Sequence, residues 1–178
     1  GVQTGRCASD PTAALTGALA PMVVTHAAAL TDPAQVGALL RAIDDYDGHP
    51  ATRAALQLSA LVFQRPGNVR ALEWAWIDLD KAMVTIPAQA MKRRIEGKLN
   101  GRPHFVPLAP QAIAILSELR PLTGGGRYVF PSLRTGERPM SDGTLNAALR
   151  RLGYAGNEMS AHGFRALART LLGEQLDA

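Results

Sequence analysis

Residues 74–86, WAWIDLDKAMVTI, decide the fold, because they place two short apolar runs on either side of a charged turn. The runs Trp76 to Asp80 and Met83 to Ile86 have the length and apolar content of strands, and Asp80-Lys81 is typical of the turn between them. A third run of the same kind is His104 to Leu108. The three runs together predict a small antiparallel sheet.

Helical patterns precede and follow these strands. Thr31-Asp32-Pro33-Ala34-Gln35 combines an Asp N-cap, Pro at the first helical position and Gln at the third, which is typical of a helix start. The expected helices are one from Pro33 with Val36, Leu39, Leu40 and Ile43 inward; Ala51 to Phe63; Gly67 to Glu73; Pro110 to Leu119; Ser141 to Leu152; and Ser160 to about Gln175 with Phe164, Leu167, Ala168, Leu171 and Leu172 inward. The fold class is therefore α+β, mainly helical.

The length of 178 residues suits one domain. Residues 1–28 are rich in Ala, Gly, Pro and Thr, and we interpret them as a linker or the tail of a missing N-terminal domain, followed by one domain over 29–178. The longest apolar stretches are too short for a bilayer span. The single cysteine, Cys7, can form no internal disulfide, which favours a cytoplasmic protein.

The charge balance favours an acidic partner. The net charge is +4, the pI is near 9.7, and 16 of the 19 basic residues are arginine. Arginine makes planar, bidentate contacts to phosphate, so nucleic acid is a candidate partner. The alternative is that the composition reflects codon usage alone.

The segment Ser160-Ala161-His162-Gly163-Phe164-Arg165 carries the most chemistry. With Ser160 as N-cap, His162 would lie in the first helical turn, and His162, Arg165 and Arg169 would share one face. Free N–H groups, an imidazole and a guanidinium at one helix start can hold a phosphate. The alternative is an exposed His and Arg that flank an apolar stripe.

Two further cations lie at breaks between elements. Arg65 precedes Pro66-Gly67 at the end of a helix and would project from a rigid turn. Lys92 follows a strand and opens a basic loop that runs to Arg102, so it could reach toward a DNA groove. The alternative for Lys92 is an ordinary solvated lysine.

The order Arg, Lys, His, Arg at these places resembles the tyrosine recombinases, most closely the integrases of prophages and genomic islands. The segments that carry the resemblance run from about Ala29 to the last residue. They are Ala29-Leu30-Thr31-Asp32-Pro33, Arg65-Pro66-Gly67, Trp74-Ala75-Trp76-Ile77-Asp78, Ile86-Pro87-Ala88, Met91-Lys92, Val106-Pro107-Leu108, Tyr128-Val129-Phe130-Pro131-Ser132 and Ala161-His162-Gly163-Phe164-Arg165. The resemblance implies the catalytic-domain fold of DNA breaking-rejoining enzymes, with its sheet on one side of the helices.

The resemblance also implies roles for single residues. Arg65 and Arg165 match the two arginines that clamp the scissile phosphate, Lys92 the hairpin lysine that protonates the departing 5′-hydroxyl, and His162 the histidine that assists proton transfer. The residues expected to contact DNA besides these are Arg93, Arg94, Lys98, Arg102 and Arg169. No metal or other cofactor is expected, because the phosphodiester energy is kept in a 3′-phosphotyrosine link. The implied partners are double-stranded DNA and other recombinase protomers, with no membrane.

Two departures from the family pattern affect the expected activity. Asn68 stands where the family usually has an acidic residue, so it can hydrogen-bond but cannot supply a charge to orient Arg65. The family's tyrosine nucleophile follows the helix of Arg165, and the sequence given has only 13 residues after Arg165. Three tyrosines precede His162, and we interpret them as packing residues: Tyr46, Tyr128 and Tyr154. We therefore expect residues 1–178 to bind DNA without cutting it, and the intact protein to catalyse site-specific recombination.

Two other functions stay open. One is a non-catalytic DNA-binding regulator with a recombinase fold, which Asn68 favours. The other is an RNA-binding or Arg-rich interaction domain, which would need exposed aromatic side chains over a basic sheet. The sequence predicts ordinary structural roles for several remaining candidates: Asp78 and Asp80 in a turn rather than a metal site, Trp74 and Trp76 at the core boundary, Met140 and Met159 as gap fillers, and His26 and His49 as solvated histidines.

Overall fold

The computed structural model describes residues 4–6, 8–9, 12, 27–91, 98 and 100–176. Helix α2 (Pro50–Val62) lies at the centre of this domain, because its small residues Ala51, Ala54 and Ala55 are buried and allow neighbours to approach closely. Four helices contact α2: α1 (Pro33–Asp44), α3 (Pro66–Arg70), α5 (Pro110–Thr123) and α6 (Thr144–Arg151). The mainly helical class is confirmed.

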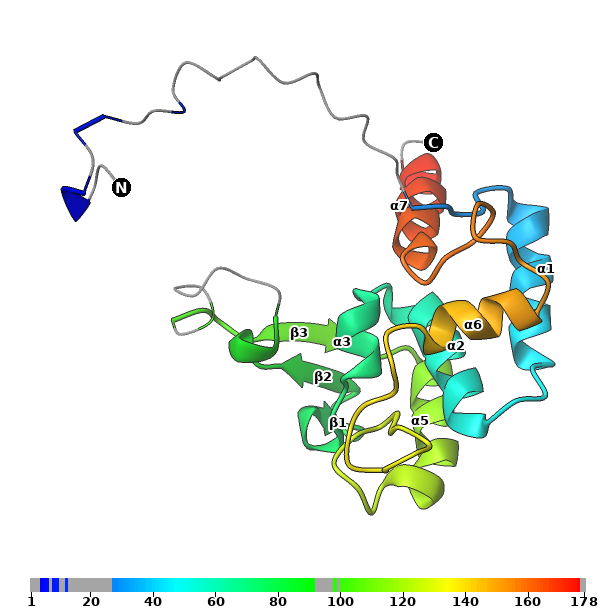
Figure 1. Cartoon of the computed structure of the whole chain (residues 1–178). Helices are drawn as coiled ribbons and strands as arrows, with labels where there is room; N and C mark the ends of the chain where they lie inside the picture. The colour runs from blue at the N-terminus through cyan, green and yellow to red at the C-terminus, as the bar shows by residue number, and fades with distance from the viewer. Residues whose placement is uncertain are drawn as a thin grey trace.

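The three predicted strands form one antiparallel sheet in the order β1-β2-β3, with β1 at Ile77–Asp78, β2 at Met83–Ile86 and β3 at His104–Pro107. Val84 pairs with Ile77 on one side and with Val106 on the other. The buried face of the sheet carries Val84, Ile86 and Val106. The sheet lies to one side of the helices, as Figure 1 shows, which confirms the predicted arrangement.

The turn between β1 and β2 confirms the prediction for its acidic residues. Asp78 accepts a hydrogen bond from the Lys81 amide at 2.9 Å and pairs with the Lys81 ammonium at 2.7 Å. This pairing holds the pKa of Asp78 below its ordinary value and raises the pKa of Lys81. Asp78 therefore holds the turn between β1 and β2, as predicted.

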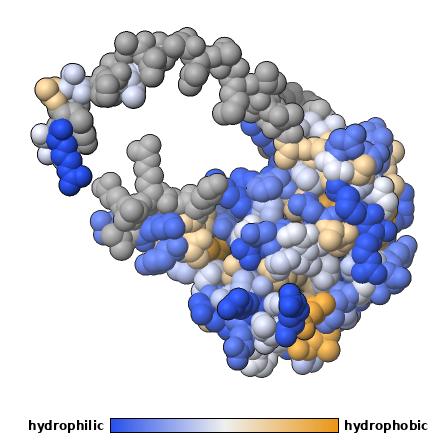
Figure 2. Space-filling model, viewed as in Figure 1, coloured by the Kyte–Doolittle hydropathy of each residue, from blue (hydrophilic) through white to orange (hydrophobic). Residues whose placement is uncertain are grey.

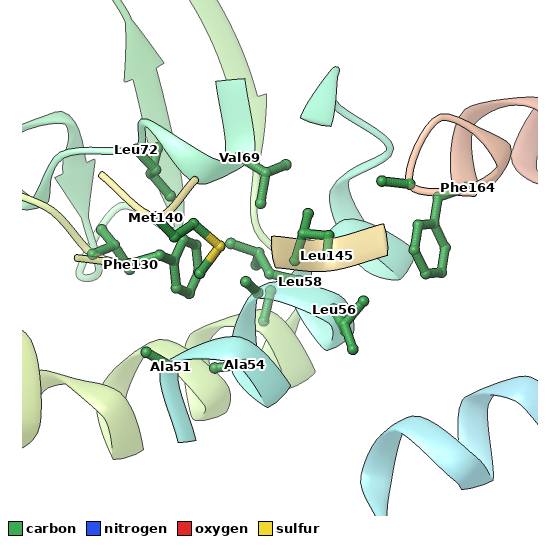
Figure 3. Close-up of a cluster of buried hydrophobic side chains, with 14 of the residues drawn as sticks. Ala51, Ala54, Leu56, Leu58, Val69, Leu72, Phe130, Met140, Leu145 and Phe164 are labelled. Atoms are coloured by element: carbon green, nitrogen blue, oxygen red, sulfur yellow. The ribbon is translucent and has the colours of Figure 1, made fainter. Parts of the chain in front are cut away.

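The core is one cluster that runs from the helices to the sheet. Figure 3 shows Leu56 and Leu58 of α2 facing Leu145 of α6, with Met140 and Phe130 close by. Met140 and Met159 are buried, as predicted for gap fillers. The tyrosine at position 46 is buried, and Tyr154 packs against the same cluster.

The boundary tryptophans are also placed as predicted. Trp74 and Trp76, both in the 3-10 turn η3 (Trp74–Trp76), are partly buried against the core. The indole N–H of Trp74 donates to the Thr123 hydroxyl at 3.3 Å. That hydroxyl in turn donates to the Val129 carbonyl at 3.0 Å, so one buried threonine joins α5, η3 and the segment before Pro131.

The predicted start of α1 is confirmed, because Asp32 caps the helix by accepting from the Gln35 amide at 2.9 Å.

Several other predicted boundaries and faces were wrong. Leu40 is 40% exposed and Leu172 is 50% exposed, so both lie at the edge of their apolar stripes rather than inward. The third helix ends at Arg70 rather than Glu73, and α6 begins at Thr144 rather than Ser141. Helix α5 continues to Thr123, four residues beyond its predicted end.

His49 is exposed, but it is more than a solvated loop residue. Its Nδ1 accepts from the Ala51 amide at 3.2 Å and caps α2, in which Pro50 takes the first position. This cap satisfies one amide that the helix start would otherwise leave unpaired. The other linker histidine, His26, lies outside the described residues.

No helix in the described part of the chain is long and apolar enough to cross a membrane.

Candidate functional site

A cleft of about 340 Å³ opens where α3, the start of α6 and the segment before the last helix meet. The residues that line it are Arg65, Pro66, Gly67, Asn68, Arg70, Ser141, Asp142, Leu145, Asn146, Ala161 and His162. They come from three stretches that are far apart in the sequence. Three of them carry a positive or titratable nitrogen group, and one carries a carboxylate.

The backbone around Arg65 is fixed by the junction of two helices. Helix α2 ends at Val62, its C-cap Phe63 has a φ of 50° in the left-handed region, and Pro66 begins α3 three residues after Phe63. The Arg65 carbonyl accepts from the amides of Asn68 at 2.8 Å and Val69 at 3.1 Å. Arg65 itself is exposed. The fold therefore projects this arginine from a rigid turn, as predicted.

The second wall is the turn Ser160–His162, followed by α7 (Gly163–Leu176). The Ser160 hydroxyl accepts from the Gly163 amide at 3.2 Å, and the His162 carbonyl accepts from the Arg165 amide at 3.1 Å. Helix α7 starts at Gly163, three residues after the predicted start at Ser160, so His162 directly precedes the helix instead of lying in its first turn. Ser160 is therefore not the residue next to the helix, as its predicted N-cap role requires, but its hydroxyl still accepts from the first amide of α7.

Arg165 reaches across to the α3 side. Its Nη1 donates to the Phe63 carbonyl at 2.7 Å, although 102 positions separate the two residues. Because Phe63 is two residues before Arg65, this hydrogen bond brings Arg165 to the margin of the cleft that Arg65 and His162 line. Arg65 and His162 thus line the cleft, and Arg165, which is not among its lining residues, is hydrogen-bonded two residues before Arg65.

Of the residues predicted in the basic loop, none that the structure describes lines the cleft. Lys92, Arg93 and Arg94 lie outside the described residues. Lys98 and Arg102 are exposed and are not among the residues that line the cleft. These five positions stay predictions.

Arg169 is exposed on α7, one helical turn after Arg165, and it is also outside the cleft lining. Its position on the same face as Arg165 agrees with the helical spacing. Any DNA contact of Arg169 would extend the surface beyond the cleft rather than complete the cleft itself.

Asn68 uses its hydrogen-bonding capacity away from Arg65. Its side chain is buried, and the Nδ2 group donates to the Met91 sulfur at 3.5 Å. Met91 follows the short 3-10 turn η4 (Ala88–Ala90), directly before the basic loop. Asn68 therefore connects the α3 wall to the start of that loop.

Three residues of the cleft were not predicted from the sequence. Arg70 forms an ion pair with Asp142 and donates to the Met140 carbonyl at 3.1 Å. Asn146 accepts from the Ala161 amide at 2.9 Å and so holds the turn before His162. In the sequence Asn146 is only a polar position on an amphipathic helix. Its partner is 15 residues away, so local periodicity could not have found it.

Figure 2 shows that the visible face of the described residues is mostly hydrophilic, with small hydrophobic patches between. Within the described part of the chain, no group of three or more His, Cys, Asp or Glu side chains could hold a metal ion. The cleft itself offers the guanidinium groups of Arg65 and Arg70, which suit a polyanion.

The sequence model of the phage integrase family matches residues 30–178, which is most of the chain. The chain belongs to the phage integrase family. The match covers α1 through α7, so the cleft lies wholly within it.

Two curated relatives agree with this assignment. The chain is 35% identical over 179 aligned residues to the putative protein IntB of Escherichia coli strain K12, covering 97% of this chain and 45% of that protein. It is 34% identical to the integrase of Enterobacteria phage P4, covering 97% of this chain and 40% of that protein. The chain thus spans less than half the length of these relatives.

Solved structures share the fold of this integrase domain. The Tn1549 transposon integrase in complex with transposon right end DNA matches with a TM-score of 0.70 and 11% identity, over 98% of this chain and 62% of that one. A λ integrase tetramer bound to a Holliday junction matches with a TM-score of 0.62 and 17% identity, over 90% and 47%. The predicted recombinase catalytic-domain fold is confirmed.

Proposed function

We propose that this integrase domain binds a DNA phosphate in its cleft, and that the intact protein carries out site-specific recombination by breaking and rejoining DNA strands. The observation that supports the proposal is that Arg65 and His162, from distant parts of the chain, line one cleft, and that Arg165 donates to the Phe63 carbonyl two residues before Arg65. A phosphoryl group that gains charge in its transition state needs fixed cations more than covalent help.

In the proposed reaction a tyrosine hydroxyl attacks the scissile phosphorus. A new P–O bond to the tyrosine forms, the bond to the 5′-oxygen breaks, and the product is a 3′-phosphotyrosine with a free 5′-hydroxyl. Arg65 and Arg165 neutralise the non-bridging oxygens, His162 assists the transfer of the proton that the tyrosine hydroxyl loses, and Lys92 gives the 5′-oxygen its proton. The 5′-hydroxyl of a second strand reverses the step.

The proposed partners are double-stranded DNA and other protomers of the same protein. The DNA-bound Tn1549 integrase and the λ integrase tetramer on a Holliday junction support this, because they share the fold. We further propose that the protein acts in the cytoplasm, and that residues beyond 178 supply the tyrosine. Tyr46 and Tyr154 pack in or against the core, which supports that assignment.

A second function, a non-catalytic DNA-binding regulator, is favoured by Asn68. Its side chain donates to a sulfur and offers no carboxylate to Arg65. The regulator would bind DNA through the same cleft and would form no covalent link. The two functions therefore differ in one measurable product, the protein–DNA adduct.

Duplex binding by residues 1–178 is tested by fluorescence anisotropy at two salt concentrations. We expect weak and largely sequence-independent binding that falls as salt rises, because phosphate contacts release counterions. Arg41, an exposed arginine of α1 outside the cleft lining, gives the matched control. Arg41→Ala should cost less affinity than Arg65→Ala, and affinity that does not fall with salt would contradict a phosphate-led interface.

Cleavage is tested with the uncut gene product on a nicked suicide substrate, followed on a denaturing gel. We expect a protein–DNA adduct from the longer protein and none from residues 1–178. Arg165→Ala should reduce the adduct about a hundredfold to a thousandfold, as for the loss of one transition-state donor. Arg165→Lys should be nearly as harmful, since an ammonium cannot make the bidentate contact. An adduct formed by residues 1–178 would place the nucleophile within this chain, and no adduct from either protein would favour the regulator.

A further inference from the structure

The chain enters the domain beside the cleft turn. The amide and the hydroxyl of Ser160 both donate to the Ala28 carbonyl, at 3.2 Å and 3.1 Å, across 132 positions of sequence. Figure 1 shows this entering segment beside α7. The residues that lead into the integrase domain therefore contact the same turn that carries His162.

Gly163 makes this approach possible. A Cβ atom on Gly163 would lie 2.4 Å from the Ala28 carbonyl oxygen and 3.2 Å from the Ala29 Cα, both of which are backbone atoms. Backbone cannot swing aside as the end of a flexible side chain can. Any larger residue at 163 must therefore push the entering segment and the turn apart.

The turn is held from its other side by α6. The Ala161 amide donates to Asn146 at 2.9 Å, and the Arg150 guanidinium donates to the Met159 carbonyl. The turn thus lies between α6 and the entering segment; it ends at His162, and Arg165 follows three residues later in α7. Loss of the contacts to α6, or of those to the entering segment, leaves the turn supported on one side only.

We propose that residues 27–29 act as a brace for the Ser160–His162 turn, and that Ser160 and Gly163 are positioning residues for His162 and Arg165. The proposal rests on the proposed function of the cleft and assigns it a control element. A change in position of residues 27–29 would then change how the cleft holds phosphate, so whatever is attached before residue 27 can influence phosphate binding without touching DNA at the cleft.

The test is a double-mutant cycle on duplex affinity with residues 1–178. Ser160→Ala removes the hydroxyl that bonds both Ala28 and Gly163, and it should weaken binding about threefold to tenfold. In an Arg165→Ala background the same change should alter affinity by about twofold at most, because the group being positioned is gone. Ser160→Thr keeps the hydroxyl and should restore most of the affinity.

Glycine variants of α7 give an independent and matched comparison. Gly163→Ala should weaken binding at least as much as Ser160→Ala, because of its clash with the Ala28 carbonyl. Gly173→Ala lies on the same helix with no atom within 4 Å of the new Cβ, so it should leave affinity unchanged. Thermal melts of all variants check that each is folded under the binding conditions, and the Ser160 cycle decides the question if Gly163→Ala does not fold.

The outcomes separate the two proposals. If Arg165→Ala leaves duplex affinity unchanged, the proposed function of the cleft fails, whatever the brace does. If Arg165→Ala weakens binding but Ser160→Ala costs the same in both backgrounds, Ser160 only stabilises the domain and the brace proposal is overturned. Coupling in the cycle together with rescue by threonine supports it.

Discussion

The Arg165 guanidinium donates to the Phe63 carbonyl at 2.7 Å, whereas the Arg65 guanidinium has no hydrogen-bond partner among the described residues. The first is oriented by the fold before any ligand arrives, and the second is oriented by its backbone alone. An arginine offers five N–H donors, so one bond to Phe63 leaves Arg165 able to bind phosphate. Arg65 must lose side-chain freedom on binding, at a cost of up to about 2 kcal/mol.

The largest expected effect is on the free energy of unfolding, and it tests how firmly the helix that carries Arg165 is packed. Phe164 is 1% exposed and anchors the helix that carries Arg165. Phe164→Ala should lower the free energy of unfolding by about 3–5 kcal/mol, as measured by urea titration. Leu172→Ala, on the exposed edge of the same helix, should change it by only about 0.5 kcal/mol. Equal losses in the two variants would show that Phe164 is no special anchor.

A smaller effect is expected on binding, and it compares the two arginines directly. Arg165→Ala should weaken duplex affinity about tenfold to a hundredfold, because a preoriented charged hydrogen bond is lost. Arg65→Ala should cost less, because the ordering penalty of its free side chain offsets part of its gain. Anisotropy titrations at one low salt concentration measure both. A larger loss for Arg65 would reverse the comparison and make the α3 wall the dominant phosphate contact.

Substitution of Asp142 is expected to raise duplex affinity rather than to lower it. It lines the cleft and pairs with Arg70, but its side chain is largely exposed. Asp142→Asn removes a carboxylate that repels DNA and should raise duplex affinity about twofold to fivefold, in line with the worth of an exposed ion pair. The gain should shrink at high salt. Weaker binding by Asp142→Asn would indicate that the ion pair with Arg70 is needed to shape the wall.

The smallest expected effect is on the melting temperature, and it comes from the pair Asp78–Lys81, which lies outside the cleft. The Asp78 carboxylate is bonded to the amide and the ammonium of Lys81, which lowers its pKa. A lowered pKa stabilises the fold above the ordinary pKa of an aspartate, and this contribution is lost as pH falls through the folded value. Asp78→Asn should thus be slightly less stable than the parent near neutral pH, and the difference in melting temperature should vanish in acid. A difference that does not change with pH would exclude the charge as its cause.

The sequence was sufficient for most of the fold because apolar periodicity and caps are local signals. The three strands and the Asp32 cap are visible within about five residues of sequence. The predicted burial of Leu40 and Leu172 was wrong, because an apolar stripe on a helix does not show how much of the stripe the neighbouring elements cover. The coverage depends on neighbours from other parts of the chain.

The site was predicted in part for a different reason. Arg65, His162 and Arg165 were found because their order resembles a family pattern, not because their spacing shows a cleft. Asn146 and Ala28 escaped prediction, since one is an ordinary polar helix position and the other contributes only a backbone carbonyl. A contact made through backbone leaves no trace in residue type.

The hydrogen bonds between Ser160 and Ala28 also bear on the order in which the domain folds. They close a loop of 132 positions, and the entropy lost in closing so long a loop is regained only once the helices between are packed. The cleft turn should thus reach its final form late, after α2 has gathered its neighbours. Partly folded chains would then carry every arginine of the domain and yet lack the proposed phosphate site.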